Sequence, residues 1–120
     1  MTPLRPSPSI LQAAALVCRM HRYEVTVAVR ADLQERFERY FIDTHIPQIL
    51  ATGCFVDIRF ERADSGVYRT VYHAATRADL ERYLTEHTTR FRADFLAHFP
   101  EGVTPSRENW TELRAYALKS

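Results

Sequence analysis

The stretch YEVTVAV at residues 23–29 alternates apolar side chains at odd positions with polar or small ones at even positions. This period of two is typical of a β-strand with one buried face. A helix is predicted to begin at Asp32, which can cap the backbone reciprocally with Glu35. Its apolar side chains recur every three or four residues, at Leu33, Phe37, Tyr40, Phe41 and Thr44. The first strand is therefore expected to lead into an amphipathic helix.

The end of this helix is predicted from a proline and a glycine. Pro47 lacks the amide proton that a helix interior needs, so we expect the helix to stop or kink near His45. Gly53 can close a short further turn, because glycine readily adopts a positive φ. A second strand is predicted to follow, with Cys54, Val56, Ile58 and Phe60 on an apolar face and Phe55, Asp57, Arg59 and Glu61 on a mixed one.

The second half of the chain repeats this pattern. Asp64-Ser65-Gly66 is a turn sequence, so residues 67–74 are predicted to return as the third strand of a hairpin. A second helix is expected after Thr76, which can form a reciprocal cap with Asp79. Its apolar face comprises Leu80, Leu84, His87, Phe91 and Phe95, with Tyr83 and Phe99 alongside.

Two features complete the second half. Thr88 and Thr89 mark a place where this helix can break, since β-branched residues are mediocre helix formers. Residues 103–113 are the last strand candidate, with Trp110 as its largest side chain.

The predicted order is strand, helix, strand, strand, helix, strand. This is the split βαβ pattern of the ferredoxin-like α+β fold, βαββαβ, in which both helices cover one face of an antiparallel sheet. The open face would be mixed in character, carrying Glu24, Thr26, Phe55, Asp57, Arg59, Arg69 and Val71. Such a face predicts a homodimer whose two sheets pack together into a barrel.

The composition is that of one domain. With 120 residues, 46% of them hydrophobic, the chain can bury a core without disulfide or metal staples. Residues 20–120 are predicted to form this domain, and residues 1–19, rich in proline and serine, a poorly packed arm. The apolar run in that arm is too short for a membrane span and lacks the basic start of an export signal. Together with two widely spaced cysteines, Cys18 and Cys54, this predicts a cytoplasmic protein.

The charge pattern excludes several partners. Sixteen Lys and Arg residues against fifteen Asp and Glu residues leave a formal charge of +1 without a basic stripe, so nucleic acid is not an expected partner. Five histidines occur without a metal-binding spacing, and the chain has no glycine-rich phosphate loop. We therefore expect no metal and no nucleotide or other cofactor.

Several blocks of sequence resemble a small bacterial domain family of unknown function. They are YEVTV at 23–27, HIPQILATGCF at 45–55, YRTVY at 68–72, LERY at 80–83 and RADFLAHF at 92–99. The family is similar to the dimeric α+β barrel group, whose members include cofactor-independent monooxygenases of antibiotic biosynthesis and haem-degrading oxygenases. The resemblance implies the fold and a dimer for residues 20 to about 113, but no established reaction. Val71 and Pro100 stand where a glutamine and a glycine are common in the family.

Four residues form the candidate ligand site: Tyr40, His45, Tyr72 and His87. If they border one cavity between sheet and helices, the site can bind a small, partly aromatic or carbonyl-bearing compound. The same residues also have ordinary structural interpretations. His45 would be a helix-terminal histidine, His87 a hydrogen-bonded core histidine, and the tyrosines part of an aromatic core.

Three classes of function stay open. A small-molecule-binding protein needs only the cavity. A cofactor-independent oxygenase or isomerase-type enzyme would also need His45 or His87 as a base with a suitable pKa. A structural or interaction module would need neither.

Overall fold

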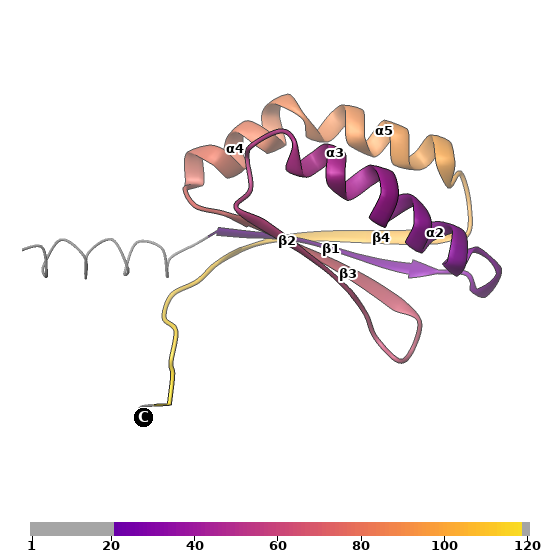
Figure 1. Cartoon of the computed structure of the whole chain (residues 1–120), viewed down its shortest axis with the longest axis horizontal. Coiled ribbons are helices and arrows are strands. Elements are labelled where there is room, and N and C mark those ends of the chain that lie inside the picture. The colour runs from indigo at the N-terminus through magenta and orange to yellow at the C-terminus, as the bar shows by residue number, and fades with distance from the viewer. Residues whose placement is uncertain (1–20, 119–120) are drawn as a thin grey trace, which may run out of the picture.

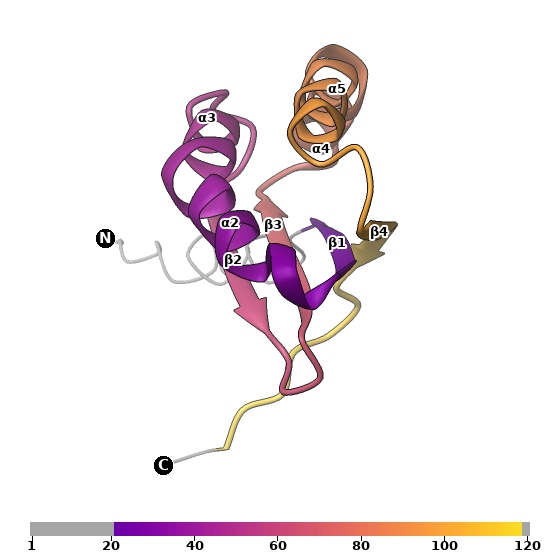
Figure 2. The same cartoon turned by 90° about the vertical axis from the view of Figure 1, so that its right-hand side faces the viewer.

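The protein, described by a computed structural model over residues 21–118, is built on a four-stranded antiparallel sheet. The strand order is β2-β3-β1-β4, and the strands are β1 (His21–Val29), β2 (Asp57–Arg62), β3 (Val67–Ala74) and β4 (Val103–Thr111). All helices lie on one face of this sheet (Figures 1 and 2). The predicted ferredoxin-like α+β fold is therefore confirmed. The arm predicted for residues 1–19 lies outside the described residues.

The first helical layer runs past the proline that was expected to end or kink it. It consists of a 3₁₀ turn η1 (Ala31–Leu33), α2 (Gln34–Tyr40), a π turn η2 (Phe41–His45) and α3 (Ile46–Leu50). In η2 the Ile46 amide donates to the Phe41 carbonyl five residues earlier. Pro47 therefore falls in the first turn of α3, where its missing amide proton removes no bond that the helix needs.

The two predicted helix caps have different outcomes. Thr76 Oγ1 accepts a hydrogen bond from the Asp79 amide at 3.0 Å and caps α4. The reciprocal bond predicted to the Asp79 carboxylate is not formed, and Asp79 Oδ1 lies 3.5 Å from Arg82 Nη2 instead. The cap predicted at Asp32 is wrong, because its carboxylate accepts from Arg30 Nε at 2.6 Å and makes no bond to the helix backbone. The adjacent guanidinium offers a charged partner, which outcompetes a neutral amide.

The second helical layer is divided as predicted near Thr88. Helix α4 (Arg77–Glu86) and helix α5 (Thr88–His98) meet at His87, whose φ of −121° leaves the helical range. The Thr88 hydroxyl donates to the Tyr83 carbonyl at 3.2 Å and stabilises the junction.

Phe55 lies in the core and not on the open face of the sheet, which corrects the sequence prediction. Strand β2 begins only at Asp57, so the alternation does not extend back through Cys54 and Val56. The Phe55 ring lies 5.2 Å from that of Tyr72 and 4.8 Å from that of Tyr83 on the helix side. The predicted turn at Asp64-Ser65-Gly66 is present, and Gly66 adopts a φ of +86°.

The core between sheet and helices is dominated by aromatic rings. Its centre is Phe37, whose ring lies 4.3 Å from Phe41 and 4.9 Å from Tyr68. On the edge strand β4, side chains facing the helices alternate with exposed ones, and Trp110 is about half exposed. Among the helices of residues 21–118, none combines the length and the apolar character needed to span a bilayer.

Candidate functional site

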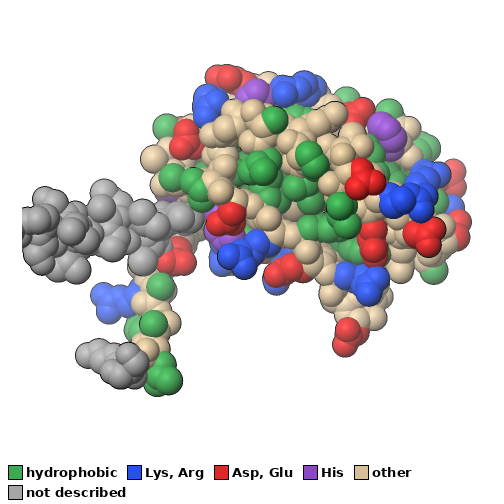
Figure 3. Space-filling model, viewed as in Figure 1, with side chains coloured by type: hydrophobic (Ala, Val, Ile, Leu, Met, Phe, Trp, Pro, Cys, Tyr) green, Lys and Arg blue, Asp and Glu red, His purple; other side chains and the backbone are tan. Residues whose placement is uncertain are grey.

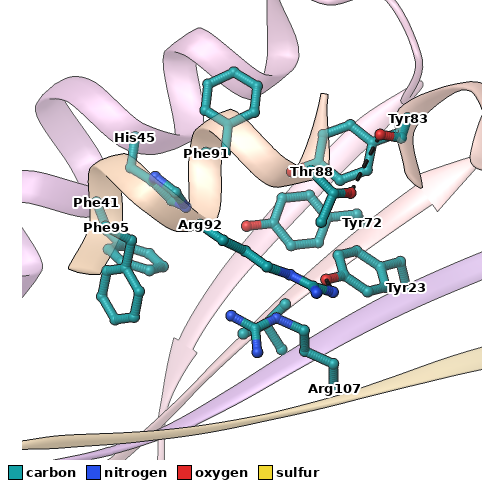
Figure 4. A pocket seen from close by; sticks show the side chains of 11 residues that line it. Tyr23, Phe41, His45, Tyr72, Tyr83, Thr88, Phe91, Arg92, Phe95 and Arg107 are labelled. Atoms are coloured by element: carbon teal, nitrogen blue, oxygen red, sulfur yellow. Dashed lines mark hydrogen bonds between the residues drawn. The ribbon is translucent and has the colours of Figure 1, made fainter. Parts of the chain in front are cut away.

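A small pocket opens between the sheet and the helices (Figure 4). It holds about 30 Å³ of free space, enough for about two water molecules. Strand pairing assembles its floor, because Tyr23 on β1 faces Tyr72 on β3, and Val25 faces Arg107 on β4. The lining residues are Tyr23, Val25, Phe41, His45, Tyr72, Tyr83, Thr88, Phe91, Arg92, Phe95 and Arg107.

His45 is the most unusual residue of this lining. It lies at the end of η2, only 7% exposed, with its ring 4.5 Å from that of Phe41 and 5.4 Å from that of Tyr40. Its Nδ1 atom has no hydrogen-bond partner within residues 21–118. Burial lowers the pKa of the imidazole to about 4, so the ring is neutral at pH 7. Because the helix continues beyond it and its Nδ1 is unpaired, His45 is not a helix-terminal cap.

Three tyrosines form the opposite wall. The ring of Tyr23 lies 5.5 Å from that of Tyr72 and 5.9 Å from that of Tyr83. Burial raises the pKa of Tyr72 and of Tyr83, so both hydroxyls stay protonated. This wall therefore supplies O–H groups that can donate or accept hydrogen bonds beside apolar rings.

Two arginines border the pocket. Arg92 extends from α5 across the space between His45 and Tyr23, and its Nη2 donates to the Tyr23 hydroxyl at 3.4 Å (Figure 4). Arg107 reaches the pocket from β4 and is half-buried. The pocket thus combines aromatic walls with two cationic groups.

Two of the four predicted site residues, His45 and Tyr72, line this pocket, and the other two lie outside its lining. The Tyr40 hydroxyl donates to Asp94 Oδ2 at 2.5 Å. Burial raises the pKa of Tyr40, and this hydrogen bond raises it further. The Tyr40 ring does contact that of His45. His87 lies at the junction of α4 and α5, with its Nδ1 2.6 Å from Arg90 Nη1.

Metal ligands do not gather in the part of the chain that the structure describes. No group of three His, Cys, Asp or Glu side chains within residues 21–118 is arranged to hold a metal ion. His73 pairs with Asp57 Oδ1 at 2.6 Å on the open face of the sheet, apart from the pocket.

The open face is the second surface of interest. It forms a broad hollow of about 600 Å³ lined mainly by charged side chains. Val71 on β3 lies between Glu24 on β1 and Arg59 on β2 and is itself buried. Arg69 pairs with Glu61 at 2.8 Å, and Arg22 lies 3.7 Å from Glu24. The lining residues are Arg22, Glu24, Asp57, Arg59, Glu61, Arg69, Val71, His73, Glu112 and Ala115.

Comparison with sequence families gives one match. A family model described as "Domain of unknown function (DUF4286)" matches residues 20–112. No curated protein matches the chain.

Solved structures share the fold at low sequence identity. A protein of unknown function from Nitrosomonas europaea matches with a TM-score of 0.64 and 11% identity, covering 87% of this chain and 99% of its own. A conserved protein of unknown function from Bacteroides thetaiotaomicron, with a suggested oxidoreductase activity, gives 0.59 and 14%, covering 78% and 97%. A Deinococcus radiodurans protein with a proposed activity as an antibiotic biosynthesis monooxygenase gives 0.62 and 14%, covering 84% and 100%. These matches and the family match confirm the resemblance predicted from the sequence.

Arg92 and Arg107 line the pocket but were not predicted from the sequence as site residues. For Arg107 a signal existed, since Val103, Pro105 and Arg107 occupy alternate positions of the last strand and face the helices. Arg92 gave no such signal, because it is adjacent to the buried Phe91 and exposed. Its long side chain nevertheless reaches back over the pocket.

Proposed function

The chain belongs to the family described as "Domain of unknown function (DUF4286)". We propose that it binds a small organic molecule in the pocket between sheet and helices. The family supplies no reaction, and the solved structures support the fold alone. The proposal therefore depends on the pocket and on one residue within it, His45.

The unpartnered Nδ1 of His45 is the observation that supports ligand binding most strongly. A buried polar atom without a partner costs free energy, and such atoms are rare in folded proteins. A ligand that supplies a hydrogen bond at this nitrogen would recover that cost. The surrounding rings of Phe41, Phe91 and Phe95 would bury the apolar part of the ligand.

Entry of a ligand requires the pocket to enlarge. Its 30 Å³ is smaller than the space that even a single aromatic ring needs. Arg92 is exposed, and its bond to Tyr23 is long at 3.4 Å. Outward rotation of this side chain would widen the entrance without moving the backbone.

Binding is better supported than catalysis by His45. General bases are most efficient when their pKa lies near the working pH. Burial brings the His45 pKa to about 4, which makes the neutral ring a weak base. The neutral imidazole is, however, a good hydrogen-bond partner, with one donor and one acceptor nitrogen.

A fragment screen by ¹H–¹⁵N NMR tests the proposal. We expect small aromatic or carbonyl-bearing fragments to shift amide signals of η2, β3 and α5 in the wild-type protein. Replacing His45 with alanine should weaken the best fragment at least tenfold, because the ligand loses its buried polar partner.

His98→Ala is the matched control. This histidine is exposed at the end of α5 and lies outside the pocket lining, so its loss should leave the affinity unchanged. If no fragment shifts the pocket signals, or if the two variants behave alike, the proposed binding site is refuted.

We also propose that the open face of the sheet pairs with the same face of a second copy. The hollow on this face is lined by three arginines and four carboxylates, so opposite charges of two copies can pair in a twofold arrangement. They are Arg22, Arg59 and Arg69 with Glu24, Asp57, Glu61 and Glu112. The C-terminal segment supports a second copy as the occupant. It leaves the body on the sheet side opposite the helices (Figures 2 and 3), with Leu113, Tyr116 and Leu118 at 87%, 86% and 100% exposed.

A charge at the centre of this face is expected to break the dimer. In Val71→Asp an unpaired carboxylate would be buried between the sheets, which should weaken dimerisation by at least tenfold. Light scattering at micromolar concentration should give a dimer mass for the wild-type protein and a lower mass for the variant. Thr85→Asp, the same change of charge on the exposed side of α4, should remain dimeric. A monomeric wild-type protein would refute the interface.

A further inference from the structure

The pocket carries two positive charges and no negative charge in its lining. Arg92 and Arg107 both contribute guanidinium groups, and none of the lining residues is an aspartate or a glutamate. His45 adds no charge at pH 7, because its burial keeps the ring neutral. The charged groups of the lining are therefore all positive, within largely aromatic walls. Asp94, outside the lining, is the one carboxylate among the groups that shift the His45 pKa.

These two arginines differ from most others in the described part of the chain. Eight arginines make ion pairs with carboxylates, namely Arg22, Arg30, Arg39, Arg59, Arg62, Arg69, Arg77 and Arg82. Within residues 21–118, neither Arg92 nor Arg107 has such a partner; Arg92 donates only to the Tyr23 hydroxyl. Where the protein supplies no counter-ion, a bound anion can do so.

The positions of the two guanidinium groups suit one ligand. Figure 4 shows Arg92 and Arg107 reaching the pocket from the helix layer and the sheet, respectively. Arg107 is held by its pairing opposite Val25 in the floor of the pocket. Its charge also acts on the pocket groups, because it opposes the effect of burial on the Tyr72 pKa. A ligand atom between the two groups would contact both layers.

We infer that the ligand of this pocket is a flat organic carboxylate, a class that deepens the binding function proposed above. Its carboxylate would accept hydrogen bonds from Arg92 and Arg107, whose planar guanidinium groups match two carboxylate oxygens. Its unsaturated or aromatic part would lie against Phe41, Phe91 and Phe95 near the neutral His45. After the ligand has entered, Arg92 would exchange its hydrogen bond to the Tyr23 hydroxyl for one to the ligand carboxylate.

A pair of probes that differ at one group, a carboxylate in place of a neutral carboxamide, tests this inference. Benzoate and benzamide have nearly the same shape, but only benzoate carries a carboxylate. Titrations followed by ¹H–¹⁵N NMR should show benzoate binding at least tenfold more tightly than benzamide, with shifts in β4 and α5. Inorganic phosphate serves as a third probe, because it is an anion without an apolar part.

Two variants and a control assign the effect to the arginines. Arg92→Gln and Arg107→Gln should each weaken benzoate at least fivefold and leave benzamide nearly unchanged. Arg39→Gln removes an exposed guanidinium of α2 that pairs with Glu35 outside the pocket, and it should bind benzoate as the wild type does.

The outcomes separate this inference from the binding function on which it rests. Equal affinity for benzoate and benzamide would overturn the carboxylate assignment and leave the pocket itself intact. Phosphate binding as tightly as benzoate would show a general anion site and would also overturn it. If neither benzoate nor benzamide shifts the pocket signals and the fragment screen also finds no ligand, both the inference and the binding function fail.

Discussion

Replacing Phe37 with alanine is expected to lower the free energy of unfolding by about 3–5 kcal/mol. The ring is 0% exposed and lies among the rings of Phe41, Tyr68, Phe95 and Phe99. Removing the ring loses the free energy gained by burying it and also leaves a cavity where the first helical layer meets the sheet. Single domains typically have a free energy of unfolding of about 5–15 kcal/mol, so this one change removes a large share of the stability of the domain.

Urea denaturation followed by far-UV circular dichroism measures the effect. Ile42→Ala is the matched control, because this side chain is on the same helical layer but 57% exposed. Its cost should stay within about 0.5 kcal/mol. A loss below about 1 kcal/mol in Phe37→Ala would contradict the placement of this ring at the centre of the core.

The second large effect is a loss of stability in mild acid that depends on His45. Its pKa is about 4 in the folded protein, against 6.5 for a solvent-exposed imidazole. As the pH falls below 6.5, the unfolded chain gains a proton that the folded protein resists until about pH 4. The contribution of this residue is complete above pH 6.5 and falls by about 3 kcal/mol toward pH 4.

The groups that act on His45 define the control for this prediction. Burial dominates the shift, Asp94 opposes it, and His98 and Arg107 add to it. His45→Phe keeps a ring in place but cannot titrate, so its stability should fall less than that of the wild type between pH 6.5 and 4. Urea unfolding at several pH values measures this difference. Parallel pH profiles for the two proteins would show that His45 is not buried in its neutral form.

The sequence was most informative where one physical constraint dominates. In β1 the alternation from Tyr23 to Val29 survives unchanged, because a strand with one buried face must place every second side chain in the core. The turn at Gly66 and the cap at Thr76 were equally predictable, since each depends on local backbone chemistry. From these elements the order of strands and helices followed.

Other features depended on competition between alternative packings, backbone geometries or hydrogen-bond partners, and the sequence does not reveal which of these is adopted. Phe55 precedes the strand and turns into the core, although its position in the alternation placed it on the open face. Pro47 was expected to end or kink the helix, but the π turn shifts the backbone so that the proline falls in an early helical position. Asp32 is a suitable residue type for a helix cap, but its carboxylate accepts a hydrogen bond from Arg30 instead.

The pocket was partly predictable for the same reasons. His45 was identified because it lies where the first helix was expected to end, and Tyr72 because it belongs to the aromatic residues between sheet and helices. Tyr40 and His87 were also expected between sheet and helices, but their polar atoms contact partners outside the pocket. Arg107 could have been found from the strand alternation. Arg92 reaches the pocket through a long, flexible side chain. Helical periodicity gives the position of its Cα atom but not the position of its guanidinium group.

A crystal structure of the protein with its tightest-binding fragment would show whether a ligand occupies the pocket. We expect the fragment between sheet and helices, with a polar atom about 2.7–3.2 Å from a His45 ring nitrogen, the normal hydrogen-bond range. We also expect Arg92 to leave the Tyr23 hydroxyl and admit the fragment. A fragment bound only on the open face of the sheet, with the pocket still closed by Arg92, would refute the proposed ligand site.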